Sequence, residues 1–364
     1  MPQTTRCRNS LPAVQADGAN MRCSGQFLRE ENQMITRRTL LQAGAALGAT
    51  LAMPYVARAA GKTMRIAHGA SEVHPGHVLA TSFAEGLEKL LPGAFDVQIF
   101  PNRQLGDDKQ LLEGTVAGTM DVTAVSGVLI PLVTGRPAMN AWQLPFLVKD
   151  YDHFGALSNG EIGRKILDDL RPAGLIGLAT ADTGQRNFLS VKKQVTSVPD
   201  FAGLKTRIVP VPLHKQIWET VGTSPVGLPY GEVYGALETG VIDAVEINVS
   251  SMLGENLWEV GKHFTLTGHY PWHMATIMSQ RYWDTLSAEE QAAVVEAGKQ
   301  SISKTLDYAK TQDLEGREEL KKKGVEIGEL TDLSVMRDKV SAMTGEWAAK
   351  DPLIAELVAA ARKA

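Results

Sequence analysis

Arg207 is the residue of this sequence whose type and position point most directly to a chemical role. It stands in the segment KTRIV at 205–209, which predicts a short buried strand around residues 206–209. A guanidinium at the end of a buried strand is unfavourable unless an anion meets it. Because its donors form a planar fork, it matches a carboxylate bidentately in a way that lysine does not. The sequence therefore predicts a carboxylate partner for Arg207, either from a ligand or from the protein itself.

Catalytic constellations are missing from the sequence. It has no Gly-x-Ser-x-Gly elbow, no His-Glu-x-x-His pair, no phosphate-binding loop and no Gly-x-Gly-x-x-Gly turn. The adjacent carboxylates Asp107/Asp108 and Glu289/Glu290 fit helix capping and solvated surface charge. These observations favour a binding protein without a cofactor over an enzyme.

Helices and strands alternate around Arg207. The pattern predicts a helix over about 211–221, a Pro/Gly-rich connection through 222–229, a helix over about 230–238 and a strand over 241–246. Such alternation is typical of α/β layering, in which residues at the carboxyl ends of strands face ligand clefts. Arg207 and Glu246 stand near two such ends.

The same alternation is expected on both sides of this stretch. Strands are predicted within 64–69, 95–100, 118–126, 263–269 and 325–327, and a helix is predicted over 78–91. Asp107 is expected to be the N-cap of the next helix. Ser287 and Glu290 form a capping-box pattern that opens a long helix to about residue 323.

Three blocks of the stretch 185–248 carry a family resemblance. They are DFAGLKTR at 200–207, GTSPVG at 222–227 and EVYGALETGVID at 232–243. In order and spacing they resemble the signature of the periplasmic solute-binding proteins of tripartite ATP-independent periplasmic (TRAP) transporters, of the DctP type. The resemblance extends over most of the chain from Met64 onward.

The resemblance implies a fold as well as a function. It implies an α/β, two-lobed periplasmic binding protein of type II-like architecture, with crossing strands and a long inter-lobe helix. Residues 60–183 and 273–312 are expected to form lobe I, and residues 184–272 and 313–364 lobe II. An organic acid would be held in the cleft between the lobes and delivered to the small and large membrane subunits of the transporter. A periplasmic enzyme or a sensory binding protein on the same fold are the alternatives.

The resemblance also assigns roles to individual residues. Arg207 occupies the position of the family's principal carboxylate-binding arginine. Arg186 occupies that of a second, assisting arginine, and its alternative is a structural role. Tyr230 aligns with an aromatic residue that packs against the ligand, and Asp108 and Ser126 match positions that face the ligand in some members.

Residues 243–248, DAVEIN, depart from the pattern of many members. Those members place an asparagine directly after the glutamate, whereas Asn248 comes one residue later, and such a shift on a strand reverses the side that a residue faces. The version here is more similar to the branch that holds 2-oxo acids through a bound cation. In that alternative Glu246 and Gln185 would supply oxygen ligands to Na⁺ or Ca²⁺. Ile247 stands where that branch usually has an aromatic residue.

Three histidines lie close together in the sequence, at 68, 74 and 77. No two of these histidines are four residues apart, the spacing that presents two ligands on one helix face. No metal site is therefore predicted from them. His74 lies in the loop after the first predicted strand. We expect it either to form a hydrogen bond in the cleft or to be part of a surface turn.

Residues 1–59 are predicted to be a leader with a twin-arginine signal peptide. Arg37 and Arg38 precede a modest apolar run at 40–53, and Ala57-Arg58-Ala59 is typical of a cleavage site. The apolar run is shorter than the roughly 20 residues that span a bilayer. Periplasmic location is therefore expected, with translation starting at Met1, Met21 or Met34.

Cleavage after this leader changes the charge and the cysteine content. The leader holds both cysteines, seven arginines and three acidic residues, so the formal net charge moves from −4 to −8. A chain without cysteine excludes disulfides, thiolate catalysis and iron–sulfur ligation. Its acidity argues against nucleic acid as a partner. We expect a monomer, a dimer being the alternative.

Overall fold

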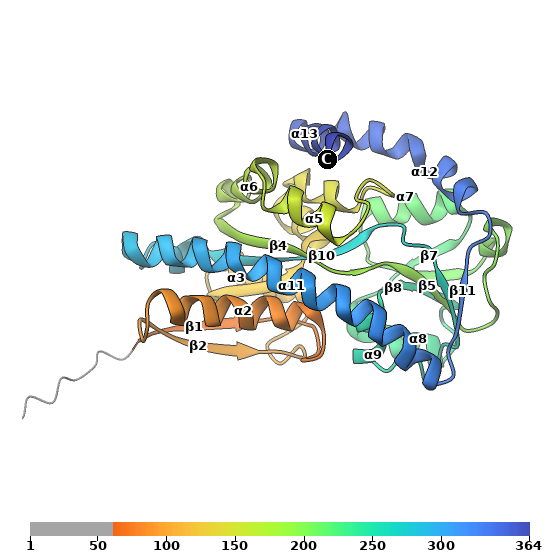
Figure 1. Cartoon of the computed structure of the whole chain (residues 1–364), viewed down its shortest axis with the longest axis horizontal. Coiled ribbons are helices and arrows are strands. Elements are labelled where there is room, and N and C mark those ends of the chain that lie inside the picture. The colour runs from red at the N-terminus through yellow and green to blue at the C-terminus, as the bar shows by residue number, and fades with distance from the viewer. Residues whose placement is uncertain (1–60) are drawn as a thin grey trace, which may run out of the picture. The chain divides into compact units, whose positions relative to one another are not determined.

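The computed structural model describes residues 61–364 (Figure 1). The predicted leader and signal peptide at 1–59 lie outside these residues. Within 61–364 no helix is both long enough and apolar enough to cross a membrane.

The first of two mixed sheets has the strand order β2-β1-β3-β10-β4. Its strands are β1 (Lys62–Ala67), β2 (Phe95–Phe100), β3 (Val122–Ser126), β4 (Leu175–Gln185) and β10 (Pro271–Ser279). β1 pairs in parallel with β2 and β3, while β10 runs antiparallel to both β3 and β4. Every residue of β10 is buried, as expected for a strand covered on both faces.

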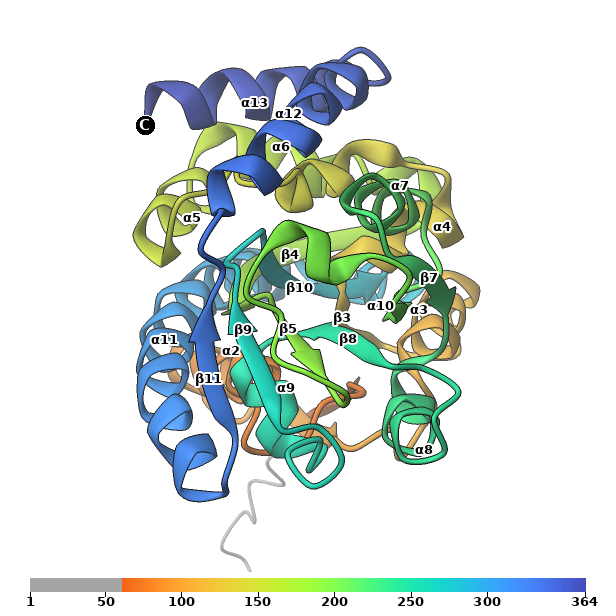
Figure 2. The ribbon, with the colours of Figure 1, turned by 90° about the vertical axis from the view of Figure 1, so that its right-hand side faces the viewer.

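The second sheet has the order β11-β9-β5-β8-β6-β7 (Figure 2). Its strands are β5 (Asn187–Ser190), β6 (Lys205–Ile208), β7 (Ser224–Gly227), β8 (Ala244–Ile247), β9 (His263–Leu266) and β11 (Glu326–Glu329). β7 corrects the prediction of an irregular connection over 222–229. It pairs in parallel with β6 at the edge of the sheet, where Pro225 is tolerated because no further strand needs its missing N–H.

Helices cover the two sheets. The α-helices are α2 (Pro75–Leu90), α3 (Asp108–Ala117), α4 (Ile130–Thr134), α5 (Tyr151–Ser158), α6 (Glu161–Asp168), α7 (Pro212–Val221), α8 (Val233–Glu238), α9 (Val249–Gly254), α10 (Gln280–Trp283), α11 (Ala288–Lys322), α12 (Leu333–Ala348) and α13 (Pro352–Lys363). Short 3₁₀ turns are η1 (Gly127–Leu129), η2 (Pro137–Gln143), η3 (Arg171–Ala173), η4 (Val198–Phe201) and η5 (Tyr230–Glu232).

The 35-residue helix α11 runs alongside elements of both sheets (Figure 1). It contacts α2 and β4 at one end and α9 and β11 at the other. Its predicted capping box is confirmed, because Ser287 Oγ accepts from the Glu290 N–H and Glu290 Oε2 accepts from the Ser287 N–H. Gly298 allows a close approach to β4, since a Cβ there would lie 2.8 Å from the Leu178 carbonyl oxygen.

Strands carry the chain between the sheets at two adjacent places, and α11 lies on a third passage, from β10 to β11. β4 ends at Gln185 and β5 begins at Asn187, so Arg186 alone joins them. The return runs from β9 to β10 through Tyr270, whose carbonyl accepts from the Arg186 N–H at 3.0 Å. These are the crossing strands that were expected.

The C-terminal helices touch elements near both sheets. α12 packs against α7, which follows β6, whereas α13 packs against α5, α6 and η2. The lobe limits at 183/184, 272/273 and 312/313 stay a prediction.

Candidate ligand-binding site

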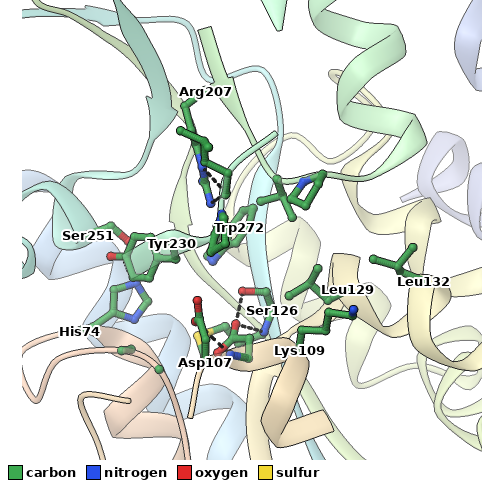
Figure 3. A pocket seen from close by; sticks show the side chains of 18 of the residues that line it. His74, Asp107, Lys109, Ser126, Leu129, Leu132, Arg207, Tyr230, Ser251 and Trp272 are labelled. Atoms are coloured by element: carbon green, nitrogen blue, oxygen red, sulfur yellow. Dashed lines mark hydrogen bonds between the residues drawn. The ribbon is translucent and has the colours of Figure 1, made fainter. Parts of the chain in front are cut away.

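A cavity of about 110 Å³ lies where the carboxyl ends of β3 and β6 meet the crossing strands (Figure 3). Six of the nine predicted ligand-binding residues line it: His74, Asp108, Ser126, Arg186, Arg207 and Tyr230. The other three, Gln185, Glu246 and Asn248, are not among its lining residues. The sequence suggested each of these six residues separately, and the structure shows that they line one cavity although they lie between positions 74 and 230.

Arg207 reaches the cavity from β6 with its side chain almost fully buried. Its Nε and Nη2 donate to the Leu228 carbonyl oxygen at 3.0 and 2.8 Å. No carboxylate of residues 61–364 forms an ion pair with it. Burial lowers the pKa of the guanidinium to about 10, although the charge of Glu246 acts in the opposite direction. Arg207 thus presents a desolvated positive charge to the cavity.

Arg186, at the crossing between the sheets, has its charge matched already. Its Nε donates to the carboxylate of Glu246, its Nη2 to the Glu246 carbonyl at 2.7 Å, and its Nη1 to Asn248 Oδ1 at 3.2 Å. The guanidinium also lies 3.9 Å from the centre of the Trp272 ring. This set of contacts favours the structural role that was the alternative for Arg186, although the residue still lines the cavity.

The pleat of β8 explains why Glu246 does not reach the cavity. β6 and β8 run in parallel with Arg207 opposite Val245, so these two side chains share one face of the sheet. Glu246, one residue later, faces the other side. There it meets Arg186 and lies 3.7 Å from His214 Nδ1. Both residues stand at carboxyl ends of strands as predicted, but on opposite faces.

Gln185 and Asn248 have partners inside the protein. Gln185 Nε2 donates to Asp182 Oδ2 at 2.7 Å. Asn248 Nδ2 donates to the Thr183 carbonyl and to Ser250 Oγ, both at 2.9 Å. The Asn248 bond to Thr183 connects β4 with the start of α9, whereas the Gln185 bond lies within β4 itself. Their predicted contact with ligand stays a prediction.

Asp108 and Ser126 are hydrogen-bonded neighbours that both line the cavity, and Figure 3 labels Ser126. Asp107 is the N-cap of α3, as predicted, and places Asp108 as the first residue of the helix. Asp108 Oδ2 accepts from the Ser126 N–H at 2.9 Å and from Ser126 Oγ at 2.6 Å. Burial raises the pKa of Asp108 despite these bonds. The pair offers hydrogen-bond acceptors to a ligand hydroxyl.

His74 offers a donor on the opposite side of the cavity. Its Nδ1 accepts from the Gly76 N–H at 2.9 Å as the N-cap of α2, so its proton is on Nε2. Nε2 lies 3.4 Å from Asn248 Nδ2, which is itself a donor because Asn248 Oδ1 accepts from Arg186. Burial lowers the pKa of His74 to about 3, so the ring is neutral at physiological pH.

Tyr230 closes the cavity on the same side as His74 (Figure 3). It begins η5, and the guanidinium of Arg103 lies 5.2 Å from the centre of its ring. Arg103 also binds the Glu255 carboxylate with two hydrogen bonds of 2.8 and 3.0 Å. Arg103 follows β2 of the first sheet and Glu255 follows α9, so the ion pair joins elements attached to different sheets.

Several lining residues were not predicted. Trp272 lines the cavity, with the Arg186 guanidinium 3.9 Å from the centre of its ring. Ser251, Lys109, Leu129 and Leu132 also line it. The sequence contained one indication of these two leucines. Leu129 and Leu132 are three residues apart just after β3, and residues with that spacing share one side of a helical turn.

Metal ligands do not gather in the part of the chain that the structure describes. Residues 61–364 contain no group of three or more His, Cys, Asp or Glu side chains placed to hold an ion. His68 and His77 face each other, with 3.0 Å between Nε2 and Nδ1, while His74 turns toward Asn248. One oxygen of Glu246, Oε2, is bound by Arg186, while the other, Oε1, lies 3.7 Å from His214 Nδ1, beyond hydrogen-bond distance.

Known proteins resemble this chain over most of its length. The family model of DctP, bacterial extracellular solute-binding protein family 7, matches residues 66–351. The C4-dicarboxylate-binding periplasmic protein DctP of Rhodobacter capsulatus is 33% identical over 303 residues, covering 82% of this chain and 89% of the relative.

Two crystal structures confirm the predicted fold class. A TRAP periplasmic solute-binding protein from Polaromonas sp. JS666, bound to D-erythronate, has a TM-score of 0.77 and 29% identity over 82% of this chain and 98% of its own. A second TRAP periplasmic solute-binding protein, from Bradyrhizobium sp. BTAi1 in complex with D-galacturonate, has a TM-score of 0.79 and 29% identity. The match covers 83% of this chain and 100% of that protein's chain. These relatives are binding proteins and not enzymes. The chain belongs to the bacterial extracellular solute-binding protein family 7, the DctP-type periplasmic binding proteins of TRAP transporters.

Proposed function

We propose that this protein captures a small organic acid by a salt bridge between the ligand carboxylate and Arg207. The observation that carries the proposal is the buried guanidinium of Arg207, which faces the cavity with a backbone carbonyl, and no carboxylate of residues 61–364, as its partner. A buried charge without a counter-charge is unfavourable, and a ligand carboxylate would remove that penalty. The water-poor surroundings strengthen the resulting ion pair.

The other lining residues take complementary roles in this proposal. Tyr230 and Trp272 provide flat surfaces, Ser126 and Asp108 accept from a ligand hydroxyl, and His74 donates from Nε2. Arg186 positions Trp272 and holds Glu246, so its contribution to ligand binding is secondary. The carboxylates named for the relatives (C4-dicarboxylate, D-erythronate and D-galacturonate) support an acid as the ligand class.

Binding serves transport in the same proposal. The protein is exported to the periplasm by the twin-arginine route, acts as a monomer, and delivers its ligand to the small and large membrane subunits of a TRAP transporter. The ligand bridges two lobes and shifts an equilibrium between open and closed forms. No cation takes part, because neither Glu246 nor Gln185 lines the cavity and Glu246 is paired with Arg186.

Thermal unfolding of protein purified from the periplasm, freed of copurified ligand, tests the proposal. An organic acid at 100 times its dissociation constant should stabilise the fold by about 2.7 kcal/mol. Arg207→Ala should abolish this shift, whereas Lys205→Ala, an exposed change on the same strand, should keep it. An acid that still stabilises Arg207→Ala as strongly as the natural protein contradicts the assigned role.

A further inference from the structure

The charges around the cavity are balanced for a single ligand carboxylate. Three cationic side chains line it, and two have partners: Arg186 is paired with Glu246, and Lys109 lies 3.4 Å from Glu113. Arg207 is left as the cation for the ligand. A second ligand carboxylate would meet Asp107 and Asp108, which line the cavity and of which Asp108 binds Ser126. This arrangement disfavours a dicarboxylate.

The cavity wall next to Arg207 is apolar. Leu129 and Leu132 face the cavity opposite His74 and Tyr230 (Figure 3). Val209 continues the strand that carries Arg207, and Leu228 supplies the carbonyl that Arg207 binds, so apolar side chains flank the guanidinium. Apart from Lys109, which lies beside Leu129 (Figure 3), these side chains offer a sugar hydroxyl no hydrogen bond in place of those that it loses to water.

The polar groups that remain suffice for a small number of ligand oxygens. Ser126 Oγ already donates to Asp108 and can accept one hydroxyl, and His74 Nε2–H can donate to one oxo or hydroxyl oxygen. We propose that the ligand is a monocarboxylic hydroxy or oxo acid with a branched aliphatic body, and that the apolar wall discriminates against polyhydroxylated sugar acids. This inference rests on the proposed function and narrows its ligand class.

Titration calorimetry on the periplasmic protein tests the inference with defined probes. 2-Hydroxy-3-methylbutanoate and 2-oxo-4-methylpentanoate represent the proposed class, D-erythronate and D-galacturonate the sugar acids, and succinate the dicarboxylates. A branched acid should bind at least tenfold more tightly than the other three, with a more negative heat-capacity change because apolar surface is buried. Equal or tighter binding of a sugar acid or succinate, lost in Arg207→Ala, overturns the inference and leaves the proposed function intact. If no acid binds, both fail.

Substitutions in the wall provide the second test. Leu129→Asn with Leu132→Asn should weaken a branched acid at least tenfold and change D-erythronate affinity less than threefold. Leu314→Asn, an exposed change on α11, is the control and should alter neither. If the double variant does not fold, Leu132→Asn alone replaces it in the test. Leu132 is 48% exposed, so this single substitution should not prevent folding. Equal weakening of both classes overturns the proposal.

Discussion

Arg186 and Glu246 form an ion pair whose two side chains are only 2% and 0% exposed. The pair joins the crossing residue between β4 and β5 to the end of β8. It meets the charge of Arg186 from within the protein, and it occupies Oε2 of Glu246. Stability and ligand affinity should therefore depend on different members of this charged group.

Glu246→Gln should destabilise the protein more than it weakens binding. The change leaves a buried guanidinium without its anion, which typically lowers the free energy of unfolding by about 3 kcal/mol. Urea unfolding measures that loss, and Glu326→Gln, on an exposed edge strand, is the matched control. Ligand affinity at low temperature, where the variant is folded, should fall less than tenfold. A stable variant with abolished binding would reverse the assigned roles.

Arg207→Lys should separate charge from geometry. Lysine keeps the positive charge but lacks the fork that binds a carboxylate bidentately, so we expect ligand affinity to fall by about 10- to 100-fold. The unliganded variant should melt close to the natural protein, because lysine keeps the buried cation and can still donate to the Leu228 carbonyl. Calorimetry measures the ligand affinity, and thermal unfolding measures the melting temperature of the unliganded variant. An affinity within threefold of the natural protein would show that charge alone is sufficient.

The ion pair between Arg103 and Glu255 should slow ligand release. It connects elements attached to different sheets, and Arg103 covers the ring of Tyr230 beside the cavity. Arg103→Ala and Glu255→Ala should each raise the dissociation rate several-fold in stopped-flow displacement. The exchange Arg103→Glu with Glu255→Arg should restore part of the loss. An unchanged rate in both single variants would make the pair a surface contact of little consequence.

Buried histidines should make the protein sensitive to mild acid. Burial lowers the pKa values of His74, His269 and His273 to about 3, so they stay neutral in the folded state while unfolded histidines protonate near 6.5. The unfolded chain then binds more protons, and the free energy of unfolding falls as the pH drops from 6.5 toward 3. Asp182 has the opposite effect on stability. Burial raises its pKa to about 8, so it stays protonated in the folded state while the carboxyl of the unfolded chain ionises above pH 3.8. The free energy of unfolding that it contributes therefore falls as the pH rises from 3.8 to 8.

The three histidines outnumber Asp182 below pH 6.5, so the net effect is acid destabilisation. Each uncompensated proton changes the free energy of unfolding by about 1.4 kcal/mol per pH unit. Urea unfolding at pH 7, 6 and 5 should show a progressive decrease, and His273→Gln should make the decrease shallower. A stability that is flat or rising toward pH 5 contradicts this account.

Asp108→Asn should relax the preference for a single carboxylate. The amide oxygen can still accept from Ser126, while the negative charge that opposes a second carboxylate is lost. Succinate affinity should rise relative to that of a monocarboxylate by about tenfold, as measured by calorimetry. Asp152→Asn is the control, because the Asp152 side chain on α5 is 83% exposed and does not line the cavity. An unchanged ratio would mean that Asp108 does not sense ligand charge.

Local sequence patterns were sufficient for much of the fold. The strand that holds Arg207, the helix after it, the Asp107 cap and the capping box of α11 all depend on residues within one or two turns, and the structure confirms them. β7 was missed because its pairing with β6 is a tertiary contact that its Pro/Gly composition conceals.

The candidate site was harder to predict because its details depend on register and on distant partners. Whether Glu246 faces Arg207 is set by the pairing of β8 with β6, which the sequence does not encode locally. The Gly76 N–H, two residues away, donates to His74 Nδ1 and so places the proton of His74 on Nε2. Whether Nε2–H has a partner inside the protein depends on Asn248, which comes 174 residues later. Trp272 lines the cavity only because the second crossing strand passes beside Arg186.

The proposed carboxylate anchor and the proposed apolar wall stand on different kinds of element. Arg207 lies on an interior strand of a six-stranded sheet, whereas Leu129 and Leu132 lie on the short turns η1 and α4. Substitutions on such turns disturb few pairing partners, so new ligand preferences can arise there while acid recognition persists. In an evolving lineage this separation lets the transported compound diversify without rebuilding the fold, and it marks η1 and α4 as the segments to randomise in a directed-evolution library.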